Sequence, residues 1–341
     1  RRDCCTKLQT SYNSPIFLFL RFVLSCEKGR RYAMILNTGM RTDIPAFYAP
    51  WLVNRLRAGE VCVRNPYDTQ QVTRYRLDPR VVDLIGFCTK NPAPMLPYMD
   101  LLAPFGQFWY VTITPYGRDV EPHVPPWEEV VRSFHQLSAA LGTHSVGWRY
   151  DPIILDAHHT LAWHRTMFAA MAEQLAGQTE VVVISFLTRY AKTRRNFPEG
   201  RDVTHAERME LGAFIIETAR RCGMTVYPCG GGDALALYGA NTGGCMTPHI
   251  YERALGRRIH FPHYQPQRRE CRCYLGADIG AYDSCPHLCR YCYANTHPAR
   301  VRRSRLAHDP ASPFLIGHAE EGDRIHEARQ ESWLERQENL F

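Results

Sequence analysis

The stretch FWYVTIT at residues 108–114 is the strongest strand signal in the chain and decides the predicted fold. It is a short apolar run of β-branched and aromatic residues, which is typical of a buried strand. A helical pattern, PPWEEVVRSFHQLSAALG at 125–142, follows it, and SVGWRY at 145–150 is the next apolar run. A strand, a helix and a second strand in this order predict a parallel crossover, which is the unit of α/β folds.

The same alternation extends in both directions from this stretch. Additional strands are predicted at 34–38, 81–89, 181–186 and 224–228, and additional helices at 45–59, 161–177 and 204–223. An inserted hairpin is predicted from the runs at 60–66 and 70–77. Six strands that alternate with helices predict a parallel sheet, closed or nearly closed as a TIM-like β/α barrel. A doubly wound open sheet is the alternative.

We expect the chain to have three parts. Residues 1–33 are expected to be an extension without a role, so that Met34 is the expected natural start. A signal peptide is the alternative, but no small-residue cleavage site follows the short apolar run. Residues 34–229 are expected to form the β/α barrel. Residues 230–341 lose the regular pattern and are rich in cysteine, so we expect them to supply a metal site rather than a further barrel unit.

The charge of the chain gives little evidence for a nucleic-acid partner. The formal net charge is +7, but the first 33 residues hold seven Lys or Arg and two Asp or Glu, which leaves about +2 for the remainder. The body therefore has no strong basic footprint, and we do not expect it to bind nucleic acid. No stretch is long and apolar enough for a transmembrane helix, so no membrane partner is expected.

Polar residues gather directly after the predicted strands, where the active site of a β/α barrel lies. The candidates for substrate or cofactor contacts at these strand ends are Arg41, Asp43, Lys90, Arg149 and Asp151. The alternative is that they are ordinary surface or capping residues. Several such clusters at one rim favour an active site.

Thirteen cysteines are many for a chain of this length, and they are unevenly distributed. The odd total and the clustering near the C-terminus argue against a secreted disulfide framework. Metal binding in a reducing compartment, the cytoplasm, fits better. Seven of the cysteines lie in one C-terminal region: Cys229, Cys245, Cys271, Cys273, Cys285, Cys289 and Cys292.

The last three of these cysteines, Cys285, Cys289 and Cys292, have the spacing C-x3-C-x2-C. Structural zinc sites and ferredoxin-type clusters usually have four ligands. Three thiolates suit a [4Fe–4S] cluster with one open iron, which can bind S-adenosylmethionine. The alternative is a Cys3His zinc site completed by His287.

The cysteine spacing, with the aromatic Tyr291 before the last cysteine, resembles the signature of the radical S-adenosylmethionine (radical SAM) superfamily. In that superfamily the aromatic residue packs near the adenine, which implies a cofactor-binding role for Tyr291. The superfamily usually carries its motif after the first barrel strand, whereas here it follows the last one.

The late position is shared with a widespread uncharacterised bacterial family, domain of unknown function 1848, which the chain resembles over roughly residues 34–333. The segments that carry this resemblance are RTDIPAFY (41–48), VRNPY (63–67), TKNPAPM (89–95), WRYDPI (148–153), GADIGAYDSCPHLCRYCYAN (276–295), HDPASPFLIGH (308–318) and QESW (330–333). The resemblance implies a fold class and a cofactor, but it implies no substrate.

Four cysteines remain near the C-terminus, and they come from three segments. Cys229 follows a predicted strand, Cys245 lies in a Gly-rich loop, and Cys271 and Cys273 form a C-x-C pair. They are candidates for a second, auxiliary iron–sulfur cluster or for a zinc ion. The alternative is four unrelated cysteines that are buried as small apolar side chains.

The sequence is compatible with three functions. The leading hypothesis is a cytoplasmic radical SAM enzyme with a [4Fe–4S] cluster, which generates a 5′-deoxyadenosyl radical on an unknown substrate and receives electrons from a flavodoxin- or ferredoxin-type donor. The second is DNA repair, since CPHLCRYCYA at 285–294 also resembles the cluster loop of spore-photoproduct-lyase-like proteins. The third is a non-enzymatic scaffold stabilised by zinc or iron.

Overall fold

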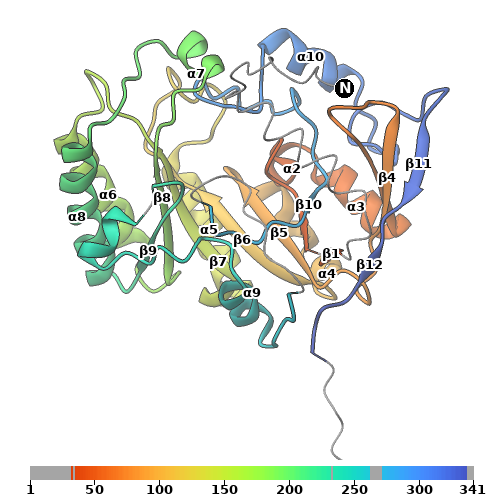
Figure 1. The fold of residues 1–341 in the computed structure, drawn as a ribbon, viewed down its shortest axis with the longest axis horizontal. Helices are drawn as coiled ribbons and strands as arrows, with labels where there is room; N and C mark the ends of the chain where they lie inside the picture. The colour runs from red at the N-terminus through yellow and green to blue at the C-terminus, as the bar shows by residue number, and fades with distance from the viewer. Residues whose placement is uncertain (1–31, 34, 232, 262–270, 336–341) are drawn as a thin grey trace, which may run out of the picture.

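The computed structural model describes residues 32–33, 35–231, 233–261 and 271–335, and its centre is a seven-stranded parallel sheet (Figure 1). Of the predicted extension at 1–33, residues 1–31 lie outside the described residues, and Tyr32–Ala33 form the short strand β1. In spatial order the strands are β10 (Ala277–Asp278), β2 (Ile35–Asn37), β5 (Leu84–Thr89), β6 (Gly106–Thr112), β7 (Val146–Ile153), β8 (Val181–Phe186) and β9 (Thr225–Pro228). The predicted α/β class and all six predicted strands are confirmed.

The order of the strands decides between the alternatives for the sheet. From β2 to β9 the strands follow one another in chain order without a reversal, so the doubly wound alternative is wrong. Among the described strands, β9 and β10 form the two open edges, so the closed form of the predicted barrel is not found. Strand β10 lies in the segment 230–341, which therefore also extends the sheet beside β2.

One face of the sheet, here called the outer face, is covered by helices. They are α3 (Ala49–Ala58), α5 (Trp127–Leu141), α6 (Leu161–Leu175) and α8 (His205–Arg221). In β6 the side chains of Trp109 and Val111 belong to the cluster on this face. Three of the four predicted helices are confirmed as the single elements α5, α6 and α8, and Thr204 forms a capping box with Glu207 at the start of α8.

The opposite face, here called the inner face, is covered by the C-terminal part of the chain. The side chains of Phe108 and Tyr110, which alternate with those on the outer face, contact α9 (Pro248–Leu255) and the segments around Cys245 and Cys273. The irregular segments after β9 therefore bury the apolar inner face of the sheet, which in a closed barrel would face the barrel interior.

The single helix predicted at 45–59 is divided at Tyr48 into α2 (Ile44–Phe47) and α3. Pro50 has no backbone N–H and so cannot continue the hydrogen-bond ladder to the preceding turn. The break turns the hydroxyl of Tyr48 toward the C-terminal region, where it donates a 2.6 Å hydrogen bond to the carbonyl of Ser284.

The remaining elements flank the main sheet. The predicted hairpin is confirmed as β3 (Glu60–Arg64) and β4 (Gln71–Arg76), and β11 (Arg324–Glu327) pairs with β4. A second small sheet joins β1 (Tyr32–Ala33) to β12 (Gln330–Glu331). Three further short α-helices in the described chain are α4 (Met99–Leu102), α7 (Ala191–Asn196) and α10 (Pro298–Leu306), and three short 3-10 helices are η1 (Ala93–Tyr98), η2 (Thr143–Ser145) and η3 (Ala234–Tyr238).

In the described part of the chain, none of the helices combines the length and apolarity that crossing a membrane requires.

His164 joins the outer helix layer to the end of β7. Its side chain in α6 is fully buried, and its ring nitrogens lie 2.7 Å from the hydroxyl of Tyr150 and 2.7 Å from the carbonyl of Ile154. Burial lowers the pKa of His164 to about 4, so the ring is neutral in the folded protein at neutral pH.

The free energy of unfolding should therefore fall as the pH is lowered from about 6.5 toward 4. In this range His164 binds a proton in the unfolded chain but stays neutral in the folded protein. The lowered pKa corresponds to about 3 kcal/mol over this range. We expect this part of the pH dependence to be absent in His164→Gln and present in the exposed control His158→Gln. Urea unfolding at several pH values tests this, and parallel curves for the native protein and His164→Gln would contradict it.

Candidate metal centre

The candidate site lies at the carboxyl edge of the sheet, which is the edge formed by the carboxyl ends of its parallel strands. Asp43 follows β2, Lys90 follows β5, and Arg149 and Asp151 lie within β7, toward its carboxyl end. Asp43 accepts hydrogen bonds from the backbone N–H of Lys90 (2.7 Å) and the hydroxyl of Thr89 (2.7 Å). Two strand ends that are far apart in sequence are thus joined through one carboxylate.

Residues 284–295, here called the cysteine loop, are held above this edge by buried contacts. His287 contacts Asp43 with its Nε2 atom at 2.9 Å, and its carbonyl accepts a 3.2 Å hydrogen bond from the backbone N–H of His123. Tyr48 holds the start of the loop through Ser284. The loop therefore covers the ends of β2 and β5 on the same chain.

The three cysteines of this loop are half-buried: Cys285, Cys289 and Cys292. They lie close enough together for one thiol to raise the pKa of another. Burial raises the pKa of all three thiols, and the neighbouring thiols raise the pKa of Cys289 further. Cys292 accepts a 3.3 Å hydrogen bond from the backbone N–H of Ala294. Such N–H donors stabilise a thiolate and tune the potential of a metal bound to it.

His287 does not offer a free nitrogen to these thiols. Its Nε2 atom contacts Asp43, and its Nδ1 atom lies 3.2 Å from the carbonyl of His123. The ring is buried and packs edge-on against Phe47. In the described ranges, no group of three or more His, Cys, Asp or Glu side chains forms a ready-made metal site.

Tyr291 lies beside a buried ion pair. Its hydroxyl donates to Glu121, which is 1% exposed, and the Nζ atom of Lys90 lies 2.8 Å from the same carboxylate. Lys90 also lies 5.8 Å from the centroid of the Tyr291 ring. Burial lowers the pKa of Lys90, but Glu121 and Cys289 raise it by more, so the ammonium group stays charged next to the cysteine loop.

The other predicted polar residues are paired with carboxylates at the same edge. Arg41 forms a 2.7 Å ion pair with Asp278 at the end of β10. Arg149 pairs with Asp151, which also accepts a hydrogen bond from Ser185. Burial raises the pKa of Asp151, but the guanidinium of Arg149 and the Ser185 hydrogen bond lower it by more, so the carboxylate is ionised.

Several buried polar atoms at this edge have no hydrogen-bond partner among the residues that the structure describes. They are both side-chain amide atoms of Asn37, the hydroxyl of Thr42 and the amide oxygen of Asn295. Asn37 ends β2, Thr42 precedes Asp43, and Asn295 ends the cysteine loop. A buried polar group without a partner is costly, so these atoms are suited to contact a bound group.

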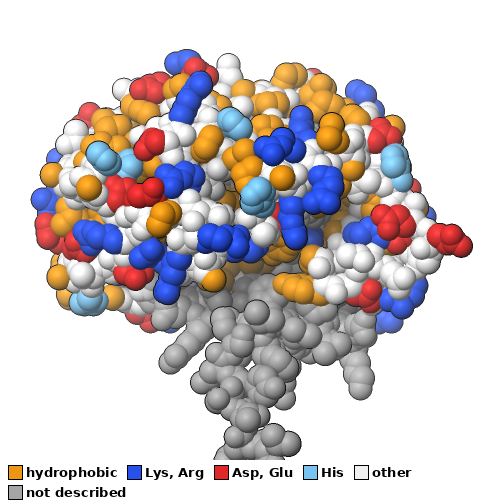
Figure 2. Space-filling model, turned by 90° about the horizontal axis from the view of Figure 1, so that it is seen from above, with side chains coloured by type: hydrophobic (Ala, Val, Ile, Leu, Met, Phe, Trp, Pro, Cys, Tyr) orange, Lys and Arg blue, Asp and Glu red, His pale blue; other side chains and the backbone are white. Residues whose placement is uncertain are grey.

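Basic side chains surround the cysteine loop on the surface. Figure 2 looks onto this end of the molecule and shows Lys and Arg distributed over it among apolar side chains. Arg194 and Arg195 come from α7, and Arg302 and Arg303 from α10. In the part of the chain that the structure describes, none of these four forms an ion pair with a carboxylate.

The second group of predicted cysteines meets on the inner face of the sheet. The sulfur of Cys245 lies 3.4 Å from that of Cys273, and Cys245 also contacts Cys229, while Cys273 contacts Cys271. Arg149 lies near this row, with its guanidinium 3.9 Å from the sulfur of Cys245. The structure therefore brings together all four cysteines from the three segments.

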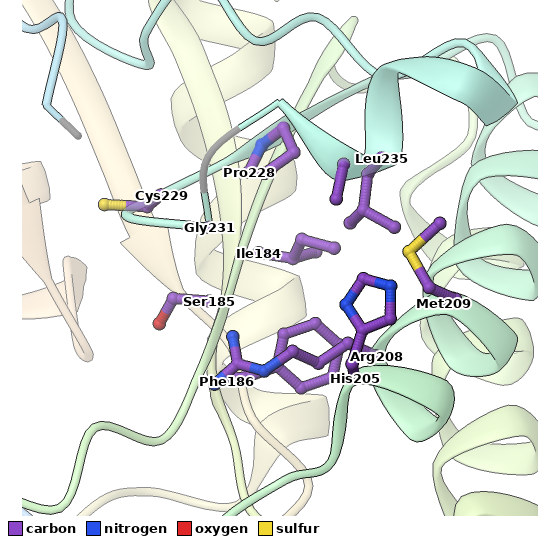
Figure 3. A pocket seen from close by; sticks show the side chains of 11 residues that line it. Ile184, Ser185, Phe186, His205, Arg208, Met209, Pro228, Cys229, Gly231 and Leu235 are labelled. Carbon is purple, nitrogen blue, oxygen red and sulfur yellow. The ribbon is translucent and has the colours of Figure 1, made fainter.

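A small cavity of about 50 Å³ lies between the ends of β8 and β9 and α8 (Figure 3). His205 and Met209 line it from α8, and Leu235 closes it. Cys229 borders the cavity, but its sulfur points away from it (Figure 3). The volume has room for a few water molecules, whereas pockets for small-molecule ligands usually measure several hundred Å³, so the cavity is too small for a substrate.

Three residues of the site were not found from sequence. Glu121, Asp278 and Ser185 neutralise or orient the predicted cations and carboxylates. Glu121 lies in an irregular loop, and Ser185 is a polar residue inside an otherwise apolar strand. Of the three, only Ser185 could have been found from the sequence, because a polar side chain within a buried apolar strand needs a hydrogen-bond partner.

The comparisons with known proteins give a family but no activity. The sequence profile of one family, described as a domain of unknown function (DUF1848), matches residues 35–294. No curated protein and no solved structure matches the chain significantly.

Replacing Lys90 by Met should lower the free energy of unfolding by about 3–5 kcal/mol, because it leaves the Glu121 carboxylate buried without its cation. Adding Glu121→Gln to the same variant should restore most of this loss. The exposed pair of Arg220 and Glu217 provides the control, and Arg220→Met should cost no more than about 1 kcal/mol. Chemical denaturation measures all three, and a loss below about 1 kcal/mol for Lys90→Met would refute the coupling.

Proposed function

We propose that this chain, which belongs to the DUF1848 family, is a radical SAM enzyme that binds a [4Fe–4S] cluster through Cys285, Cys289 and Cys292. One observation carries the proposal: a single loop presents three neighbouring thiols above the carboxyl edge of a parallel sheet, next to buried charged side chains. This edge is where α/β proteins bind their ligands.

The residues around the loop suit such a cofactor. Three thiolates leave one iron of the cluster open for S-adenosylmethionine. The N–H group of Ala294 points at the sulfur of Cys292, and Lys90 places a positive charge beside Cys289, which offsets the negative charge of a thiolate cluster. The unpartnered atoms of Asn37 and Asn295 offer donors and acceptors for the amino and carboxylate groups of S-adenosylmethionine.

The side chains at the edge have roles that follow from their pairing. When bound, the cluster and S-adenosylmethionine supply radical chemistry that abstracts a hydrogen atom from a substrate. Arg149 and Asp151 fix one another, and the ionised Asp151 accepts from Ser185, so this pair can orient a polar substrate. The ammonium group of Lys90, which pairs with Glu121, places a positive charge at the carboxyl edge next to Cys289.

We also infer that the sheet is a partial β/α barrel. Strands in chain order with helices on one face are what an incompletely closed barrel would have. The proposal further requires a reducing compartment such as the cytoplasm, where free thiols persist, and an electron donor of the flavodoxin or ferredoxin type.

Cys289→Ala should lose iron and cofactor cleavage together. We expect the anaerobically purified full chain to contain about four iron atoms per chain and to release 5′-deoxyadenosine when dithionite and S-adenosylmethionine are added. The same variant should retain its far-ultraviolet circular dichroism spectrum, because the loop is also held through Tyr48 and His287.

Cys222→Ala, at the end of α8 and outside both cysteine groups, is the matched control and should keep both properties. Cleavage at full rate by Cys289→Ala would sink the proposal. Zinc in place of iron at Cys285, Cys289 and Cys292 of the native protein would instead favour the scaffold hypothesis.

DNA repair is a second candidate function, and the surface around the loop favours it. Tyr190 and Tyr293 are 49% and 52% exposed; Tyr190 directly precedes α7, and the carbonyl of Tyr293 accepts a 3.2 Å hydrogen bond from Lys192 of α7. Basic side chains interleaved with exposed aromatic rings are typical of surfaces that bind single-stranded nucleic acid. The sequence did not predict this surface, because its two halves lie about 100 residues apart in the chain.

If this surface binds nucleic acid, Arg302→Gln with Arg303→Gln should weaken binding of a single-stranded oligodeoxynucleotide about tenfold or more at low salt. The slope of log K against log salt should fall by about 1.5, since each lost phosphate contact removes roughly 0.7. Fluorescence anisotropy over a salt series measures both. The matched pair Arg220→Gln with Arg221→Gln, exposed at the end of α8, should have no effect, and an equal loss in both pairs would rule out a specific surface.

A further inference from the structure

We propose that Cys229, Cys245, Cys271 and Cys273 form a mononuclear tetrathiolate site for a zinc-like divalent cation, rather than a second iron–sulfur cluster. The site is separate from the cysteine loop and does not depend on the proposed radical chemistry. It lies on the inner face of the sheet, where three chain segments meet.

The fold brings these segments into close contact through specific packing. Cys229 directly follows β9, and its backbone N–H donates 2.8 Å to the carbonyl of Ile184 in β8. Gly244 has a φ of +105°, and a Cβ atom there would lie 2.8 Å from the carbonyl oxygen of Arg272. Only glycine permits this close approach, which places the next residue, Cys245, against Cys273.

The spacing of the sulfurs distinguishes a single ion from a cluster. At a Zn–S distance of about 2.3 Å, two sulfurs of a tetrahedral site lie about 3.8 Å apart. The Sγ atoms of Cys245 and Cys273 lie 3.4 Å apart, which is near this spacing, and each of the two also contacts one further thiol. In a [4Fe–4S] cluster each thiolate binds a different iron, which holds all four sulfurs well beyond contact, and in a [2Fe–2S] cluster only the two thiolates on the same iron lie close together. Here three successive contacts link all four thiols, which fits a single ion better than either cluster.

The surroundings supply the charge and hydrogen bonds that a thiolate site needs. Four thiolates around one divalent cation carry a net charge of −2, and the Arg149 guanidinium lies 3.9 Å from the sulfur of Cys245. The backbone of Met246 also hydrogen-bonds to the sulfur of Cys273. The sulfurs now form a row, so binding requires side-chain rotations that turn the outer two, Cys229 and Cys271, onto one ion.

The location gives the site a structural role. Cys245, Cys271 and Cys273 belong to the segments that cover the inner face, and Cys229 belongs to the sheet. A shared ion would therefore fasten this cover to the sheet and support β10, which follows Cys273 and leads into the cysteine loop.

The test compares three forms of the full chain, each refolded or expressed with added Zn²⁺ and analysed for bound metal. We expect about one zinc per chain in the native protein and in a Cys285→Ser, Cys289→Ser, Cys292→Ser variant, and at least a tenfold loss of zinc in Cys271→Ser with Cys273→Ser. Co²⁺ in place of zinc should give the intense ligand-field absorption of tetrahedral thiolate coordination only in the first two.

A second measurement needs no variant and so does not depend on folding of the mutants. In the native zinc-loaded protein these four thiols should resist alkylation until a chelator is added, while Cys222 provides an internal reference. Alkylation of all four before chelation, a Cys245–Cys273 disulfide, or iron in place of zinc at these residues would each overturn the proposal.

Discussion

The structure depends on how an open parallel sheet buries its second face. Helices cover the outer face in the usual way, but the sheet is not closed, and the inner face presents large side chains such as Phe108 and Tyr110. Leaving this surface in water would cost about 25 cal/mol for each Å² of apolar area. The chain after β9 covers this apolar face. Its path positions the four cysteines of the inner face and leads to the cysteine loop at the carboxyl edge.

The carboxyl edge shows a second constraint, which is the cost of burying charge. Each predicted cation there has a carboxylate partner: Glu121 for Lys90, Asp278 for Arg41 and Asp151 for Arg149. A buried charge without such a partner would be strongly destabilising. The pairs also hold their side chains in fixed positions, so the same interactions that make the edge stable make it suitable for orienting a ligand.

The sequence predicted well the features that depend on local patterns. Strands such as 181–186 are short apolar runs, and helices such as that at 204–223 carry caps that can be read from neighbouring residues. The helix at 45–59 is predicted as one element because Pro45 and Gly59 mark its start and its end, whereas the break at Tyr48 depends on Pro50 and on a contact with Ser284 far along the chain.

By itself the sequence determined the parallel α/β class, the positions of the strand ends and the identity of the thiols, because these follow from periodicity and residue type. Only the tertiary structure decided that Glu121 lies beside Lys90, that His287 contacts Asp43, and that Cys229, Cys245, Cys271 and Cys273 form one row. These pairings depend on the path of the chain across the inner face and the carboxyl edge. That path is set by the packing of distant apolar surfaces, which leaves no local signal in the sequence.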